Sequence, residues 1–95
     1  MLFALIAEDT SDPQKRLDAR ADHLKHLESL GDRVVLAGPF SSKEGVMNGS
    51  FMVIEADSFE EAEALYKQDP FMQRGVFASF SIRPWKLSIN NTAGR

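Results

Sequence analysis

The spacing of hydrophobic residues changes several times along the chain, and each change predicts a new element. An apolar run from Leu2 to Ala7 is typical of a β-strand. From Pro13 to Leu30 apolar residues recur every three or four positions, which predicts an amphipathic helix. Gly31 stands where a helix C-cap would lie. The helix residues expected to face the core are Leu17, Ala21, Leu24, Leu27 and Leu30.

Two further strands are predicted in the middle of the chain. Residues 33–40 are rich in Val and Leu and stop at Gly38 and Pro39, which favours a strand that ends there. Residues 41–49 are polar and contain glycines, so they are predicted to form a loop. Residues 50–56 are again mostly apolar and predict a third strand.

A second helix follows the third strand. Ser58 and Glu61 have the spacing of a capping box, in which each residue satisfies a backbone N–H group at the start of a helix. The helix is predicted to continue to about Gln68 and to end at Asp69 and Pro70, because a proline disfavours helical backbone in the preceding residue.

A fourth strand completes the domain. The run from Val76 to Leu87 is apolar enough for a strand, with an interruption at Pro84, and residues 90–95 form a polar tail. The resulting order, βαββαβ, predicts an α+β fold of the ferredoxin-like type, with a four-stranded antiparallel sheet and two helices on one face. We expect one domain over residues 1–89 and a flexible tail over residues 90–95.

The predicted strands are apolar on both faces. A sheet with one face in water should alternate apolar and polar residues, but residues 2–7, 34–36 and 51–54 carry apolar side chains at both parities. The helices can cover only one face, so the sheet is expected to pair with the sheet of a second copy. The alternative is that these residues are singly exposed apolar groups, which are common on protein surfaces.

Composition narrows the classes of function. The 95 residues allow a single core, and the net charge of −3 without a basic run does not favour nucleic-acid binding. No cysteine is present, so disulfides and thiolate chemistry are excluded. The apolar N-terminus is only seven residues long, too short for a signal peptide or a membrane span. We expect a cytoplasmic protein that contacts neither membrane nor nucleic acid.

Two polar residues fall on the predicted apolar face of the first helix. A buried guanidinium is costly without a partner, so Arg20 should either reach a carboxylate or line a water-filled cleft. His23, one turn away, is either a hydrogen-bonded core histidine or a functional base beside Arg20. His26 lies at the border of the polar face and is expected to be structural.

Asp69 is the carboxylate we expect beside His23. Both helices cover the same sheet face, so the end of the second helix can meet the first, and a carboxylate can orient a histidine for proton transfer. Its alternative role is to end the helix and cap a turn. A metal site is weaker, because Asp22, His23 and His26 lack a further convergent ligand. We therefore predict no metal and no cofactor.

Several short motifs together resemble the YciI-like family. They are Arg20-x-x-His23-Leu24, Gly38-Pro39, Ser58 with Glu61-Ala62, Asp69-Pro70-Phe71, Gly75-Val76 and Ile82-x-Pro84. The resemblance spans residues 1 to about 87 and implies the fold of muconolactone isomerases and other dimeric α/β barrels, in which two sheets pack face to face.

The resemblance also implies a site. His23 and Asp69 match a proposed catalytic pair of the family, Arg20 matches a further recurrent position, and Gly38, Pro39 and Phe71 are expected to contact a substrate. One relative removes chloride from a chlorinated hydroxyhydroquinone, which implies lyase or isomerase chemistry on a small aromatic or enol-type molecule. The alternatives are a ligand-binding or accessory module without catalysis, and a cofactor-independent oxygenase.

Overall fold

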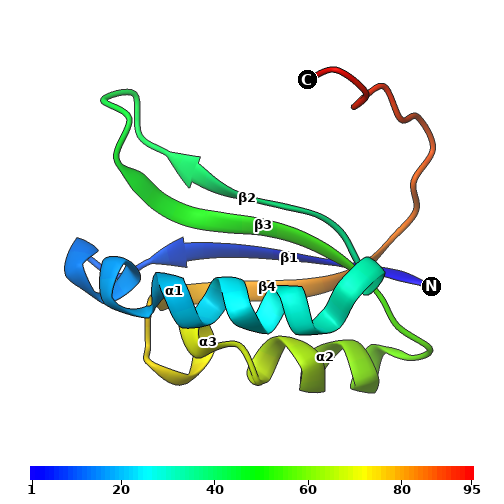
Figure 1. The fold of residues 1–95 in the computed structure, drawn as a ribbon, viewed down its shortest axis with the longest axis horizontal. Coiled ribbons are helices and arrows are strands. Elements are labelled where there is room, and N and C mark those ends of the chain that lie inside the picture. Colours follow the sequence, from blue (N-terminus) through cyan, green and yellow to red (C-terminus); the bar gives the residue numbers. More distant parts are fainter.

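Strands and helices are arranged in two layers in the computed structural model, which describes all 95 residues. The sheet has the strand order β2-β3-β1-β4 with every neighbouring pair antiparallel, and the helices lie on one of its faces (Figure 1). The predicted ferredoxin-like fold class is therefore confirmed. The elements are β1 (Leu2–Asp9), α1 (Pro13–Leu30), β2 (Val34–Ser41), β3 (Met47–Glu55), α2 (Phe59–Lys67), α3 (Pro70–Gln73) and β4 (Phe77–Trp85).

Local signals at both ends account for the bounds of α1, which the sequence predicts correctly. The Asp12 carboxylate accepts a hydrogen bond from the Gln14 N–H at 3.0 Å, and Pro13 occupies the first turn, where its missing N–H costs nothing. At the other end Gly31 has a φ of 59°, a conformation that glycine adopts without strain.

The second helix ends close to the predicted Gln68, which is its C-cap, and is followed by a third helix that was not predicted. Ser58 caps α2 by accepting a hydrogen bond from the Glu61 N–H at 3.1 Å. Asp69 and Pro70 stop this helix but also begin α3, because the Asp69 carboxylate accepts a hydrogen bond from the Phe71 N–H at 2.9 Å. Asp69 is thus a cap for a new turn of helix that leads the chain into β4.

The predicted loop 41–49 is for the most part a tight hairpin. The Ser42 N–H donates to the Val46 carbonyl at 2.9 Å, and β3 already begins at Met47. Gly49 lies within β3, where a Cβ would come within 2.5 Å of the Ala7 carbonyl oxygen. A side chain at this position would therefore push β1 and β3 apart.

The main core lies between the sheet and the helices. Phe3 and Leu5 of β1 are opposite Ile54 and Met52 of β3, and all four side chains are buried. Tyr66 of α2 closes this cluster, together with the smaller residues Ala7, Ala56 and Ala62. No helix in the chain is both long enough and apolar enough to span a membrane.

The predicted buried face of α1 is partly wrong. Leu17 and Leu24 are 56% and 44% exposed, and Ala21 is exposed as well. Arg16, Ala19 and His23 are buried instead. The helix is rotated because two polar side chains find partners inside the protein, and periodicity counts only apolar residues as inward-facing. Arg20, expected within the apolar arc, is exposed. The rotation leaves the Arg20 and Leu24 side of the helix over an open groove beside β2.

The opposite face of the sheet carries no helix. We call it the open face; its apolar side chains come from all four strands and are Leu2, Ala4, Ile6, Leu36, Phe40, Phe51, Val53 and Trp85. The C-terminal residues beyond β4 leave the sheet on this side and form no helix or strand (Figure 1). The open face is the surface expected to pair with a second copy.

Candidate functional site

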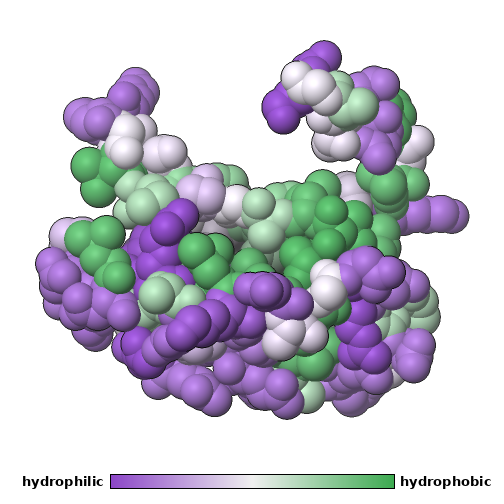
Figure 2. Space-filling view, viewed as in Figure 1, coloured by the Kyte–Doolittle hydropathy of each residue, from purple (hydrophilic) through white to green (hydrophobic).

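A cavity of about 200 Å³ lies between α1 and the strands β2 and β3. Figure 2 shows apolar residues gathered between α1 and these strands, with polar residues over the outer surfaces of the helices. The polar side chains that line the cavity belong to Arg16, Arg20, His23 and Ser50. The other lining residues are Leu24, Leu27, Ala37, Gly38, Pro39, Met47, Met52 and Phe71.

His23 and Asp69 meet at the inner wall of this cavity. His23 Nδ1 lies 2.8 Å from both carboxylate oxygens of Asp69, and the Asp69 residue is only 1% exposed. An ionised carboxylate can only accept hydrogen bonds, so Nδ1 carries the proton. The Phe71 N–H also donates to this carboxylate, which fixes the side chain of Asp69.

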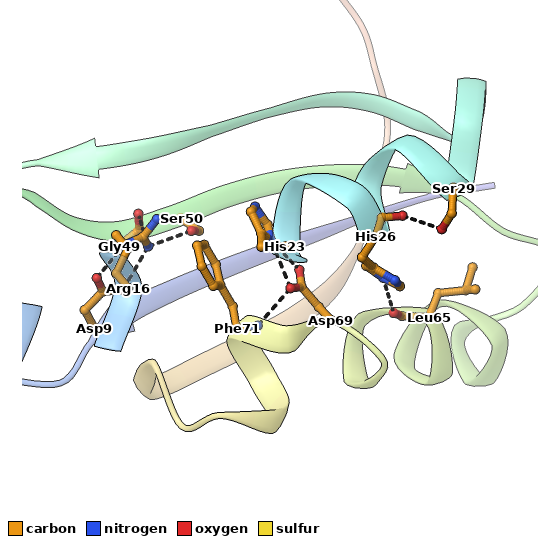
Figure 3. A network of polar contacts seen from close by, with 10 residues as sticks. All are labelled: Asp9, Arg16, His23, His26, Ser29, Gly49, Ser50, Leu65, Asp69 and Phe71. Carbon is orange, nitrogen blue, oxygen red and sulfur yellow. Dashed lines mark hydrogen bonds and ion pairs between the residues drawn. The ribbon is translucent and has the colours of Figure 1, made fainter. Parts of the chain in front are cut away.

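The second ring nitrogen of His23 faces the cavity. Nε2 makes no hydrogen bond within the protein, and no buried polar side-chain atom is left without a partner, so Nε2 is accessible. Figure 3 shows it directed away from Asp69, toward β2. With the proton held on Nδ1, neutral His23 presents the lone pair of Nε2 to the cavity, which is the arrangement required of a general base.

Phe71 holds the plane of the His23 ring. The two rings stack with centroids 3.8 Å apart and an interplanar angle of 6°. Arg16 lies over the same phenyl ring, with its guanidinium carbon 4.7 Å from the centroid. Figure 3 shows the order Arg16, Phe71, His23 along α1. Phe71 therefore fixes the histidine between the carboxylate and the cavity.

Arg16 is the centre of a second buried network. Its Nε and Nη2 donate to the two carboxylate oxygens of Asp9 at 2.6 Å and 2.9 Å. Nη2 also lies 2.7 Å from the Gly49 carbonyl and 2.8 Å from Ser50 Oγ. The two-point contact with the carboxylate pairs both buried charges and joins the end of β1 to α1. The contacts with Gly49 and Ser50 extend the network to β3.

Arg20 lines the cavity without an ion pair. Of the two outcomes predicted for it, a carboxylate partner or a cleft, the structure shows the cleft. Its exposed guanidinium at the cavity is available to a ligand. His26, expected to be structural, lies outside the cavity, where its Nε2–H donates to the Leu65 carbonyl at 3.1 Å and links α1 to α2.

The structure brings together all of the predicted site residues and adds others. Gly38, Pro39 and Phe71 line the same cavity as Arg20 and His23, and Asp69 lies behind it. Sequence reasoning missed the network of Asp9, Arg16 and Ser50. One signal was available, because Arg16 lies seven residues before His23 and so shares its face of α1.

No three His, Asp or Glu side chains converge in the chain as a metal site would require. The chemistry that the cavity offers through its own residues is a positioned imidazole base, a hydroxyl group and two guanidinium groups. Such a set can bind oxygen atoms of a ligand and move a proton.

The fold and the cavity define a small ferredoxin-like domain with a cleft between α1 and the strands β2 and β3. The chain matches the model of the YCII-related domain over residues 1–86, and it belongs to this family, as the sequence analysis predicts. It is 36% identical to Protein YciI of Escherichia coli O6:H1, in an alignment covering 90% of this chain and 97% of that protein.

Solved structures agree with this assignment. The chain is similar to the 5-chloro-2-hydroxyhydroquinone dehydrochlorinase TftG from Burkholderia phenoliruptrix AC1100, solved in complex with 2,5-dihydroxybenzoquinone. The TM-score is 0.82 at 33% identity, over 93% of this chain and 96% of TftG. Rv0793 from Mycobacterium tuberculosis has a TM-score of 0.58 at 13% identity, over 95% and 100% of the two chains, and shows the shared fold alone.

Proposed function

We propose that this protein is a cofactor-free enzyme that transfers a proton on a small aromatic or enol-type molecule, with elimination where the molecule carries a leaving group. The observation that carries the proposal is the buried contact between His23 and Asp69, which leaves His23 Nε2 open to the cavity. In this proposal His23 is the base, Asp69 orients it, and Arg20 binds an anionic or oxyanionic group of the ligand.

The proposed step begins with a hydroxyl group of the ligand against His23 Nε2. The hydroxyl proton moves to Nε2, and the Asp69 carboxylate stabilises the imidazolium that forms. The electron pair left on oxygen forms a carbonyl, the double bond shifts, and the carbon at its far end takes up a proton from the imidazolium, which is isomerisation. Where a saturated carbon beside an enol double bond carries a leaving group, that group instead departs with its bonding electrons, so the ligand loses one proton and one anion. In a chlorinated hydroxyhydroquinone the chlorine-bearing carbon takes up the proton first, and a second hydroxyl then loses its proton as chloride departs.

The relatives and the size of the cavity support this substrate class. TftG is a dehydrochlorinase of a hydroxyhydroquinone, and its quinone ligand is a single six-membered ring with oxygen substituents. The cavity here, of about 200 Å³, is smaller than the pockets of roughly 300 Å³ and more that hold drug-sized ligands. It therefore suits one ring better than a nucleotide or an extended chain.

We further propose that the working form is a homodimer joined through the open face. Ile6, Phe40 and Trp85 on this face are 42%, 44% and 38% exposed, and they belong to different strands of one continuous surface. A symmetric second copy would cover this face with the same apolar residues. The cavity lies on the helix side of the sheet, so this pairing leaves it accessible.

The test combines a substrate with a matched pair of histidine variants. The protein is incubated with 5-chloro-2-hydroxyhydroquinone, and released chloride is measured by ion chromatography. We expect His23→Gln to reduce the rate by about 10²- to 10⁴-fold, the usual contribution of a positioned acid or base. His26→Gln, on the same helix but outside the cavity, should retain the rate. Equal rates in wild type and His23→Gln would contradict the proposal.

A second candidate function, ligand binding without catalysis, is favoured by one observation. Arg20 and Leu24 at the cavity are exposed, so no element of the chain shields the site from water. Many catalytic steps require such shielding. Titration with 2,5-dihydroxybenzoquinone separates the two functions. Binding without chloride release would favour the binding module, and turnover that depends on His23 would favour the enzyme.

A further inference from the structure

The network of Asp9, Arg16 and Ser50 contains hydrogen-bond donors that the fold does not use. Ser50 Oγ accepts a hydrogen bond from Arg16 Nη2 at 2.8 Å, but its own hydrogen has no acceptor within the protein. Arg16 Nη1 likewise makes no hydrogen bond to the protein. Because no buried polar atom is left without a partner, Nη1 must keep some accessible surface. Both residues line the cavity.

We propose that Arg16 and Ser50 form a second binding subsite in the cavity that takes a neutral carbonyl oxygen of the ligand. In this subsite the Ser50 hydroxyl and the outer edge of the Arg16 guanidinium donate to the same oxygen. This inference rests on the proposed function and deepens it, because it states which group the ligand must carry besides the hydroxyl that faces His23.

The charge of the network selects a carbonyl over a carboxylate. Asp9 pairs with Arg16 through two hydrogen bonds, and the two side chains are each 5% exposed, so their charges largely cancel at short range. An anion beside this pair would be attracted by Arg16 but repelled by Asp9. A neutral oxygen acceptor gains the hydrogen bonds without that repulsion. Arg20, exposed and without an ion pair, remains the position for an anionic group.

A purely structural role accounts for only part of the network. Contacts with Asp9 and the Gly49 carbonyl are enough to join β1, α1 and β3 through Arg16. They leave unexplained why a hydroxyl lies on the cavity wall with its oxygen held by a cation and its hydrogen without an acceptor. A donor held in place in this way needs little reorganisation when a ligand oxygen arrives.

The two polar ends of the cavity are separated by one phenyl ring. Arg16 and His23 contact the same side chain, Phe71, which lies between them (Figure 3). A ligand that lies across the edge of Phe71 can therefore place a hydroxyl at His23 Nε2 and a carbonyl at Ser50. The substrate class that follows is a single ring with a hydroxyl and a carbonyl on different carbons, as in a hydroxyquinone or a cyclic hydroxyenone.

The test uses two probes that each address one end of the cavity. Cyclohexanone has a carbonyl but no hydroxyl, and phenol has a hydroxyl but no carbonyl. Each is titrated into ¹⁵N-labelled protein, and NMR follows the backbone amides of Gly49 and Ser50 and the Nε–H of Arg16. In wild type we expect cyclohexanone to shift these signals. Ser50→Ala should weaken the cyclohexanone affinity by about three- to tenfold, the usual value of one hydrogen bond, and leave the phenol affinity unchanged.

Two further variants make the result decisive. Ser41→Ala makes the same chemical change at an exposed strand end that does not line the cavity and should leave both affinities unchanged. Ser50→Cys keeps the side-chain bulk but is a poorer donor, so it should also lose affinity for cyclohexanone alone. It replaces Ser50→Ala if that variant does not fold.

Specific outcomes would overturn the subsite. They are the absence of a cyclohexanone response at Gly49, Ser50 and Arg16 in wild type, an unchanged cyclohexanone affinity in the Ser50 variants, or an equal loss for both probes. Failure of the proposed function is separate from these outcomes. If His23→Gln leaves chloride release unchanged while cyclohexanone binding still depends on Ser50, proton transfer by His23 is wrong and the carbonyl subsite stands.

Discussion

The two faces of the sheet are built from the same strands but differ in what covers them. On the helix face Leu5 and Met52 are 0% and 1% exposed. On the open face Ile6, the direct neighbour of Leu5, is 42% exposed, and Phe40 is 44% exposed. Both sets are apolar, so hydrophobicity alone does not distinguish the faces. The difference is that α1, α2 and α3 all pack on one side (Figure 1).

The buried polar residues lie on the helix face, beside the apolar core, rather than on the open face. The helix face contains the buried pairs of His23 with Asp69 and of Arg16 with Asp9. The covered face therefore contains the candidate site, where low exposure strengthens hydrogen bonds and ion pairs, whereas the open face offers apolar area for association.

The largest effect is expected on the free energy of unfolding, when the neighbouring residues Leu5 and Ile6, which point to opposite faces, are each replaced by alanine. Leu5→Ala should lower the free energy of unfolding by about 2–5 kcal/mol, because it leaves a cavity in the core. Ile6→Ala should cost less than about 1 kcal/mol in dilute protein, because the Ile6 residue is already 42% exposed. Urea denaturation followed by circular dichroism, at a low and a high protein concentration, measures both. Equal losses at low concentration would contradict the comparison.

The second prediction concerns association through the open face. Ile6→Lys places a charge in the proposed interface and should weaken dimerisation by about a hundredfold, because a charge loses its hydration there. Light scattering should show wild type at twice the chain mass of 10.6 kDa and the variant near that mass. Leu17→Lys, at an exposed residue of α1, is the matched control and should stay dimeric. A monomeric wild type would refute the proposed pairing.

The third prediction concerns the charge behind His23. Asp69→Asn can still cap α3 but lacks the charged acceptor, so the preference of neutral His23 for a proton on Nδ1 should fall by about tenfold or more. The ¹⁵N chemical shifts of the imidazole distinguish the two tautomers. His26→Gln in both proteins removes the other histidine signal. An unchanged tautomer ratio would show that Asp69 does not orient the ring.

The smallest effect is expected from Tyr66, which joins α2 to the covered face. Burial raises the pKa of the Tyr66 phenol, and its hydroxyl lies 2.9 Å from the Phe3 carbonyl oxygen. Above the ordinary value of 10.0 the unfolded chain loses this proton while the folded chain keeps it. Stability should therefore fall by about 1.4 kcal/mol for each pH unit above about 10.

The control for this prediction is Tyr66→Phe, which should lack that part of the pH dependence. Tyr66 is the only tyrosine of the chain, so the ultraviolet absorbance of tyrosinate reports its ionisation directly. If wild type and Tyr66→Phe lose stability in parallel above pH 10, burial of the phenol does not contribute to the pH dependence.

Much of the fold could be predicted because its signals are local. The cap at Asp12, Pro13 in the first turn and Gly31 at the end bound α1 without reference to the rest of the chain. The short helix α3 was missed because Asp69 and Pro70 both end one helix and begin another, and the same two residues signal both events. The turn at residues 42–46 left fewer loop residues than composition suggested.

The site could be predicted only in part. His23 and Asp69 are predicted together because a histidine on an inward-facing stretch needs a partner, and the family resemblance indicates the same two residues. Arg16 is not predicted because the periodicity of α1 is read from its leucines. These leucines place the inward face toward Leu17 and Leu24, which the structure shows to be exposed. A buried arginine is recognisable only when its carboxylate, here Asp9 from another element, is known to lie beside it.

The order of the four strands and the two longer helices, the family and the apolar character of both sheet faces follow from local signals in the sequence, because caps, turns and alternation act over a few residues. The tertiary structure decided which face the helices cover, how α1 is rotated, and which side chains share the cavity. Asp9, Arg16 and Ser50 come from three elements and become neighbours only when β1, α1 and β3 pack together. Burial makes such polar contacts strong, and burial is a property of the packed molecule.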